Sequence, residues 1–290
     1  MLLAATVLLS SLSACVTSQG HRQSDLAWRA PTESRQLASL DSFVVEPRSS
    51  SRDHRVAAAV SPTSSTELEP GQWKVVLVSG SRAIPAHDAA VLDLGQRLRG
   101  RGVTQVAMAL TGGPGDVDAS RAGIRQALEG LGDQQGACLF FATGHGNVAG
   151  LRLDADRGNR TLTPGELDRL LDKHCGDRPT VAIISDCDAG VFLDSRMRQP
   201  NRILIAASAK GRNSYGAKMN ERHVNFDRCL MGAIDAGAST WREAFERSLP
   251  CVREREAWLG VRPSEPQAYF GAAVADLAIP GATRLTAQMR

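Results

Sequence analysis

In the stretch Cys138-Leu-Phe-Phe-Ala-Thr-Gly-His145-Gly146, an apolar run ends in small residues and a histidine. A second stretch, Val181-Ala-Ile-Ile-Ser-Asp-Cys187, ends in a cysteine. Near-continuous hydrophobicity over such short runs is typical of parallel strands that are covered on both faces. Each stretch therefore predicts a buried strand whose carboxyl end leads directly to a chemically reactive side chain.

On either side of these two stretches, further short apolar runs alternate with amphipathic helical patterns. This alternation predicts an α/β fold with a mostly parallel sheet. Residues 163–166 read Thr-Pro-Gly-Glu, a helix start with an N-cap, Pro at the first position and a capping-box Glu. The five strands are expected at 74–79, 104–110, 138–143, 180–185 and 202–208, and the helices at 87–99, 117–130, 164–173, 225–236 and 241–254.

His145 and Cys187 are both expected just beyond the carboxyl end of a parallel strand. Ligands of open parallel sheets bind outside the carboxyl ends of the strands. A thiol attacks as the thiolate, and an imidazole can take its proton. Either residue alone is more often structural, but the joint placement of His145 and Cys187 favours a cysteine hydrolase. The backbone N–H groups of Gly146 and Cys187 are the expected donors to a developing oxyanion.

The composition of the chain limits the binding partners and cofactors that we expect. The chain has 290 residues, 42% of them hydrophobic, and its 34 basic and 31 acidic residues leave a net charge of +3. No basic stripe with interleaved aromatic residues is present, which argues against a nucleic-acid partner. The Cys and His residues lack the close spacings of a zinc site, so we expect neither a metal nor another cofactor.

The N-terminus has the pattern of an export signal. Residues 2–12 form an apolar run of about 11 residues, too short to span a bilayer. It ends in Leu12-Ser-Ala-Cys15, which resembles the bacterial lipobox, although no basic residue precedes the run. The resemblance implies a signal peptide over 1–15, lipidation of Cys15 and a lipid-anchored protein of the bacterial cell envelope that faces the periplasm. Residues 16–70, rich in Ser, Thr, Arg and Pro, predict a flexible tether before a domain at 71–290.

An exported chain meets an oxidising compartment, in which cysteines can pair. Cys229 and Cys251 lie in neighbouring predicted helices and could form a disulfide. Cys138 lies in a predicted core strand, so we expect it to be a free, buried thiol.

Four ordered motifs extend this interpretation to a family. They are Gly144-His-Gly146, Ser185-Asp-Cys-Asp-Ala-Gly190, Pro200-Asn-Arg-Ile-Leu-Ile-Ala-Ala207 and Ser264-Glu-Pro-Gln267 before Tyr269-Phe-Gly271. Together they resemble the legumain-like cysteine peptidases and, more distantly, the caspases. The resemblance implies a caspase-like three-layer sandwich with a mostly parallel central sheet.

The same resemblance implies roles for residues. Cys187 would be the nucleophile, His145 the general base and later the general acid, and Gly146 an oxyanion donor. The stretch Asn213-Ser214-Tyr-Gly216 resembles the segment that forms one wall of the family's specificity pocket. The expected substrate is a peptide or protein.

The residues beside the nucleophile depart from the family. Asp186 stands where the family usually has Ala, and Asp188 follows Cys187. Two nearby carboxylates disfavour a thiolate and should raise its pKa. Alternatively, Asp186 faces a basic substrate side chain, or both carboxylates bind turn amides. Arg82, in the loop after the first strand, could bind a substrate carboxylate, although an exposed loop Arg is the simpler interpretation.

The sequence thus predicts a membrane-tethered cysteine endopeptidase that cleaves peptide bonds through an acyl-thioester. Two alternatives stay open. One is a catalytically silent caspase-like lipoprotein that binds peptides or envelope partners. The other is a transamidase, because an amine can resolve an acyl-thioester in place of water.

The lipobox leads to a direct test. We expect the mature protein to enter the detergent phase in detergent partitioning, and Cys15→Ser to move it to the aqueous phase, because the acyl chains supply the membrane affinity. Equal aqueous partitioning of both proteins would refute lipidation at Cys15.

Overall fold

The computed structural model describes residues 68–132, 136–216 and 221–282. At its centre is a seven-stranded sheet in the order β10-β9-β8-β4-β1-β2-β3. Every neighbouring pair is parallel except β10, which runs antiparallel to β9. The strands are β1 (Lys74–Ser79), β2 (Gln105–Leu110), β3 (Val117–Asp118), β4 (Cys138–Thr143), β8 (Thr180–Ser185), β9 (Arg202–Ala206) and β10 (Gln267–Phe270).

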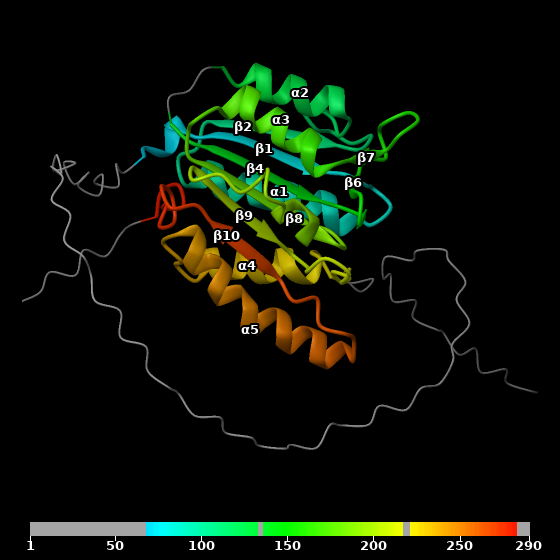
Figure 1. The fold of residues 1–290 in the computed structure, drawn as a ribbon. Coiled ribbons are helices and arrows are strands. Elements are labelled where there is room, and N and C mark those ends of the chain that lie inside the picture. The colour runs from blue at the N-terminus through cyan, green and yellow to red at the C-terminus, as the bar shows by residue number, and fades with distance from the viewer. Residues whose placement is uncertain (1–67, 133–135, 217–220, 283–290) are drawn as a thin grey trace, which may run out of the picture. The chain divides into compact units, whose positions relative to one another are not determined.

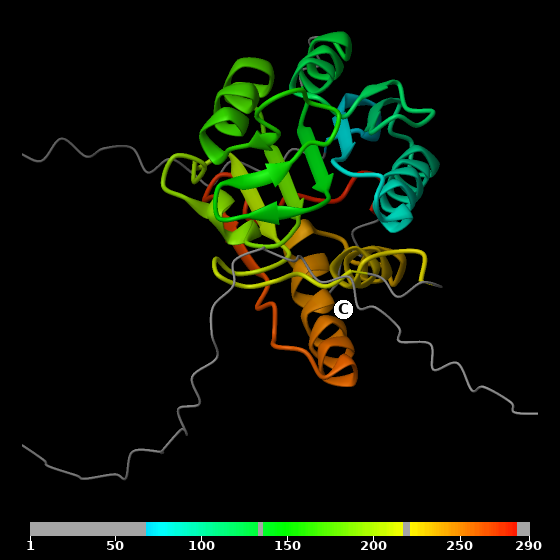
Figure 2. The same ribbon diagram turned by 90° about the vertical axis from the view of Figure 1, so that its right-hand side faces the viewer.

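Helices cover both faces of this sheet, as Figures 1 and 2 show. On one side lie α2 (Arg121–Gly130) and α3 (Pro164–Cys175). On the other lie α1 (Pro85–Gly100), α4 (Asn225–Asp235) and α5 (Trp241–Leu259), and a short 3-10 helix, η1 (Pro70–Gln72), precedes β1. The predicted α/β class with a mostly parallel sheet is therefore confirmed.

The strands are apolar throughout because both of their faces are buried. Successive side chains of a strand point to opposite faces. Val75 and Leu77 accordingly join the core under α1, α4 and α5, together with Trp73 and Trp241. Val76 and Val78 join a second core under α2 and α3.

Several elements differ from the sequence prediction. The helix expected from residue 117 begins only at Arg121, because Ser120 caps it by accepting a hydrogen bond from the Gly123 amide, and Val117 instead pairs with β2 as part of β3. The strand expected at 202–208 ends at Ala206, and the helix expected at 241–254 extends to Leu259. The edge strand β10 and a small antiparallel sheet that follows His145 were not predicted. The strands of this small sheet, β5 (Gly146–Asn147), β6 (Gly150–Arg152) and β7 (Thr161–Leu162), are too short to show a repeating pattern.

The expected signal peptide, the lipidation site Cys15 and almost all of the expected tether lie outside the described residues. Within the described part of the chain, no helix has the length and apolar character that crossing a membrane requires.

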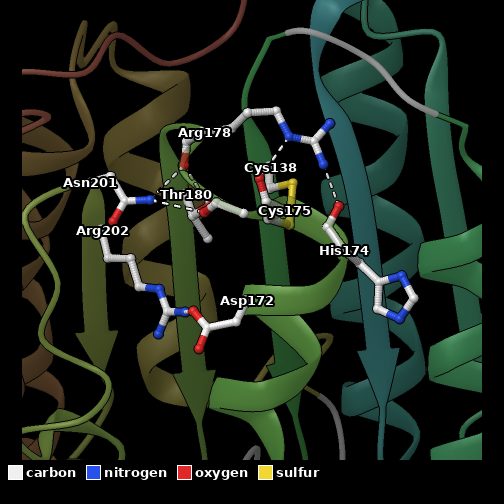
Figure 3. Close-up of a disulfide and its surroundings, with 9 residues drawn as sticks. Cys138, Asp172, His174, Cys175, Arg178, Thr180, Asn201 and Arg202 are labelled. Carbon is white, nitrogen blue, oxygen red and sulfur yellow. Dashed lines mark hydrogen bonds and ion pairs between the residues drawn. A yellow bond between two sulfur atoms is a disulfide. The ribbon is translucent and has the colours of Figure 1, made fainter.

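Two disulfides join pairs of residues that the structure describes. Cys229 of α4 bonds to Cys251 of α5, as the sequence suggested. Cys138 bonds to Cys175, so the expectation of a free thiol in β4 is wrong (Figure 3). The first residue of β4 meets the last residue of α3, a proximity that depends on how the helix packs across the sheet rather than on sequence spacing.

A buried ion-pair group fixes α3 on the same face of the sheet. Arg202, at the start of β9, is almost fully buried and donates to Asp168 at 2.7 Å and to Asp172 at 2.6 Å (Figure 3). A buried guanidinium requires such partners, because an unpaired charge in the protein interior is strongly unfavourable. Together with the disulfide, this group ties the middle and the C-terminal end of α3 to the sheet.

The Cys138–Cys175 disulfide leads to a stability prediction. The bond closes a long loop, with a sequence separation of 37. We expect the double variant Cys138→Ala/Cys175→Ala to lose about 2–4 kcal/mol of unfolding free energy in urea denaturation, because the cross-link restricts the unfolded chain. Peptide mapping without reductant should recover the two cysteines linked, and alkylation of Cys138 under those conditions would contradict the pairing.

Candidate active site

The two predicted reactive residues follow adjacent, parallel strands. β4 and β8 pair in register up to their last residues, Thr143 and Ser185. The Gly144 amide extends this pairing by donating to the Ser185 carbonyl at 3.2 Å. His145 and Cys187 each lie two residues beyond this last pair, so their backbones leave the sheet side by side.

One pocket receives both residues. Its lining includes His145, Cys187 and the 214–216 segment, with Ile84 and Val224 as apolar walls. The Cys187 side chain is buried, and its Sγ lies 3.4 Å from the Ser214 carbonyl oxygen. The pocket is partly open, and the space within it is about 20 Å³, room for about one water molecule.

The environment of His145 favours its neutral form. Burial lowers the pKa of His145, and the nearby Arg152 charge lowers it further, whereas Asp154 acts in the opposite direction. A neutral imidazole has a nitrogen lone pair that can accept a proton. His145 is therefore electrostatically suited to act as a base.

A second histidine, which the sequence analysis missed, lies beside the first. His87, in the first turn of α1, lines the same pocket. The centroids of the His87 and His145 rings are 5.6 Å apart, and the rings meet edge to face. Burial lowers the pKa of His87 to about 4, with a smaller opposing effect of the Ser81 carbonyl at 3.2 Å from Nδ1. His87 is thus a neutral wall of the pocket at neutral pH.

An acidic residue of the small antiparallel sheet region faces the histidines. The Ser81 hydroxyl donates to Asp154 Oδ2, and Arg152 donates to Asp154 Oδ1, each at 2.5 Å. Burial alone would raise the pKa of Asp154, but these hydrogen bonds and the Arg152 charge hold it below its usual value. Asp154 therefore stays ionised and favours a positive charge on either histidine.

The two carboxyl groups beside Cys187 have different surroundings. The Asp186 carboxyl is buried, and neither oxygen has a hydrogen-bond partner among the described residues. Burial, with a smaller effect of Asp188, raises the pKa of Asp186 well above its usual value. Because its neutral form is favoured, the expected repulsion of a thiolate by Asp186 is weakened. Asp188 accepts a hydrogen bond from the Gly211 amide at 2.6 Å and so holds a turn.

Gly146 packs directly on the turn that carries Cys187. A side-chain carbon built on Gly146 would lie 2.3 Å from an Asp186 carboxyl oxygen and 2.5 Å from the Cys187 carbonyl oxygen. These distances leave no room for any larger residue. The close approach brings the two backbone segments that carry the expected oxyanion donors into contact.

The remaining predicted substrate contacts divide between the pocket and its surroundings. Ser214 lines the pocket of His145 and Cys187, whereas Asn213 is exposed and is not part of that lining. Arg82 lies in a neighbouring, open hollow with Thr111, Asp118 and Asp154. Arg82 and Asn213 thus do not line the pocket of His145 and Cys187.

A buried carboxyl lies beneath the two strand ends. Asp227 of α4 accepts a hydrogen bond from the Thr143 hydroxyl at 2.8 Å. Burial raises the pKa of Asp227 to about 7, although hydrogen bonds from Ser185 and Thr143 act to lower it. Asp227 therefore connects α4 to the end of β4, the strand that leads to His145.

Among the described residues, no group of three or more His, Cys, Asp or Glu side chains could hold a metal ion. No protein-family model matches the chain, and no curated protein matches it. Conclusions about the site therefore rest on its geometry and on the motifs in the sequence.

The raised pKa of Asp227 predicts a pH-dependent stability. The folded protein keeps the Asp227 proton up to about pH 7, whereas the unfolded chain releases it near 3.8. The protonated Asp227 carboxyl contributes to the free energy of unfolding. This contribution is complete below about pH 4 and is lost as the pH rises to about 7. Asp227→Asn does not titrate. Its unfolding free energy relative to wild type should therefore rise by up to about 4 kcal/mol between pH 4 and 7.

Urea denaturation of both proteins at several pH values measures this difference. The exposed ion pair of Asp235 with Arg97 provides a control on the same helix, because Asp235→Asn should show no comparable rise over that interval. A constant difference between Asp227→Asn and wild type would contradict a raised pKa of Asp227.

Proposed function

We propose that the chain is a cysteine endopeptidase with a caspase-like fold, similar to the legumain-like peptidases and anchored by lipid in the bacterial cell envelope. The observation that carries the proposal is the in-register end of β4 and β8, which brings His145 and Cys187 into one pocket. The sheet order, the helices on both faces and the antiparallel edge strand β10 are compatible with the proposed fold.

In this proposal, neutral His145 takes the proton of the Cys187 thiol, and the sulfur attacks the carbonyl carbon of the scissile peptide bond. The resulting oxyanion accepts hydrogen bonds from the backbone N–H groups of Gly146 and Cys187. His145 then gives its proton to the leaving amine. Water hydrolyses the acyl-thioester and regenerates the thiol.

The electrostatics of the pocket support this division of roles. Burial keeps His145 neutral before the reaction, and ionised Asp154 stabilises the imidazolium that forms during it. The neutral form of Asp186 adds little repulsion to the developing thiolate. Asp154 therefore offsets part of the penalty that burial places on the imidazolium, and Asp186 adds little to the penalty on the thiolate.

The dyad is tested by Cys187→Ala and His145→Ala. Each variant should lose peptide cleavage by more than about a thousandfold, because the nucleophile and its base act as one unit. Both should unfold at temperatures close to that of wild type. The assay includes a mild reductant, because the proposed reaction uses Cys187 as a thiol.

His174→Gln is the matched control, since His174 lies in α3 close to Cys175 and the opposite end of the sheet, and it should keep cleavage within twofold (Figure 3). A peptide with an electrophilic end group should label Cys187 in wild type and far more slowly in His145→Ala. Cleavage retained by either dyad variant would refute the mechanism, and absence of both cleavage and labelling in wild type would favour the silent binding protein.

A further inference from the structure

The backbone turn that carries Cys187 is held by a serine from the next strand. Ser208 follows β9 by two residues and is completely buried. Its hydroxyl donates to the Asp186 carbonyl at 3.0 Å and accepts from the Ala189 amide at 3.1 Å. A single side chain therefore bridges the two residues that flank the Cys187–Asp188 turn.

The bond to Asp186 determines where the amide of the next residue points. The Asp186 carbonyl and the Cys187 N–H belong to one peptide unit, which is planar and normally trans. In a trans unit the N–H points away from the carbonyl. Fixing the carbonyl on the Ser208 side therefore directs the Cys187 N–H to the opposite side of the plane.

The rest of the turn is held by the segment that follows Ser208. The Asp188 amide donates to the Arg212 carbonyl at 2.8 Å, and the Gly211 amide donates to the Asp188 carboxylate. Asp188 itself has φ of 61°, a left-handed conformation that Asp adopts more readily than most residues other than Gly but that is still less favourable than the right-handed one. These contacts maintain a backbone conformation that the turn would not favour alone.

We propose that Ser208 is a positioning residue that directs the Cys187 amide toward the oxyanion of the reaction. The proposal rests on the proposed peptidase function and deepens it. The hydroxyl of Ser208 touches no reacting atom. It acts through the Asp186–Cys187 peptide, which it orients and, by hydrogen bonding to the carbonyl, polarises into a stronger N–H donor.

The variant Ser208→Ala removes both hydrogen bonds and leaves the rest of the side chain. Loss of one oxyanion donor costs about a hundredfold to a thousandfold in kcat. A donor that is misdirected rather than removed should cost less, and we expect kcat for a peptide substrate to fall by about tenfold to a hundredfold, with KM within twofold of wild type.

Ser248→Ala is the matched control. Ser248 is equally buried, but its hydroxyl donates to the Phe245 carbonyl within α5 at 2.7 Å. We expect this variant to keep kcat and KM within twofold. Thermal melting of both variants shows whether a fall in kcat reflects partial unfolding.

A second measurement separates orientation of the amide from displacement of the thiol. Iodoacetamide alkylates a thiolate at a saturated carbon and forms no oxyanion. The alkylation rate of Cys187, followed by peptide mass spectrometry after mild reduction, should therefore stay within twofold of wild type in Ser208→Ala. Unchanged kcat, or alkylation that falls in parallel with kcat, would overturn the role of Ser208.

The outcomes also separate this proposal from the one it rests on. A wild-type protein that alkylates at Cys187 but cleaves no peptide would overturn the peptidase function and the role of Ser208 with it. Cleavage by wild type that Ser208→Ala retains in full would overturn the role of Ser208 alone.

Discussion

The in-register pairing of β4 with β8 is the constraint on which the site depends. Parallel hydrogen bonding aligns Thr143 with Ser185, and each of the two reactive residues follows one of these strand ends at the same distance along the chain. A shift of the pairing by one residue would turn the side chains of a strand to the opposite face. Because both faces of these strands are buried in separate apolar cores, burial maintains the register that aligns the two residues.

Burial also sets the protonation states around the pocket. His87, Asp186 and Asp227 all have pKa values shifted toward the neutral form, because removal from water penalises charge. Asp154 is the exception, since Ser81 and Arg152 stabilise its carboxylate. Around His145 and Cys187, these three groups favour their neutral forms, whereas Asp154, Arg152 and Asp188 are charged neighbours.

Long apolar runs were the most predictable part of the fold, because they depend on local pattern and on burial of both faces. The expected bounds of β1, β4 and β8 agree with the structure, and Pro164 begins its helix with the predicted capping box. Short elements were not predictable, since two or three residues cannot show a period. The partner of Cys138 was also missed, because helix packing rather than spacing brings Cys175 to it.

The position of His87 in the pocket could also not be predicted from the sequence. His87 could be placed at the pocket only from the strand order. β1 lies next to β4, so the start of α1, which follows β1 in the chain, borders the pocket. Ser208 carries no sequence signal, as its role depends on a bond to a turn from another strand. The sequence alone was enough to predict the α/β class and the main strands and to select His145 and Cys187 as candidates, because hydrophobic pattern and side-chain chemistry are local properties. Only the tertiary structure decided which neutral, charged and hydrogen-bonding groups surround those residues, because burial and strand order bring distant segments together.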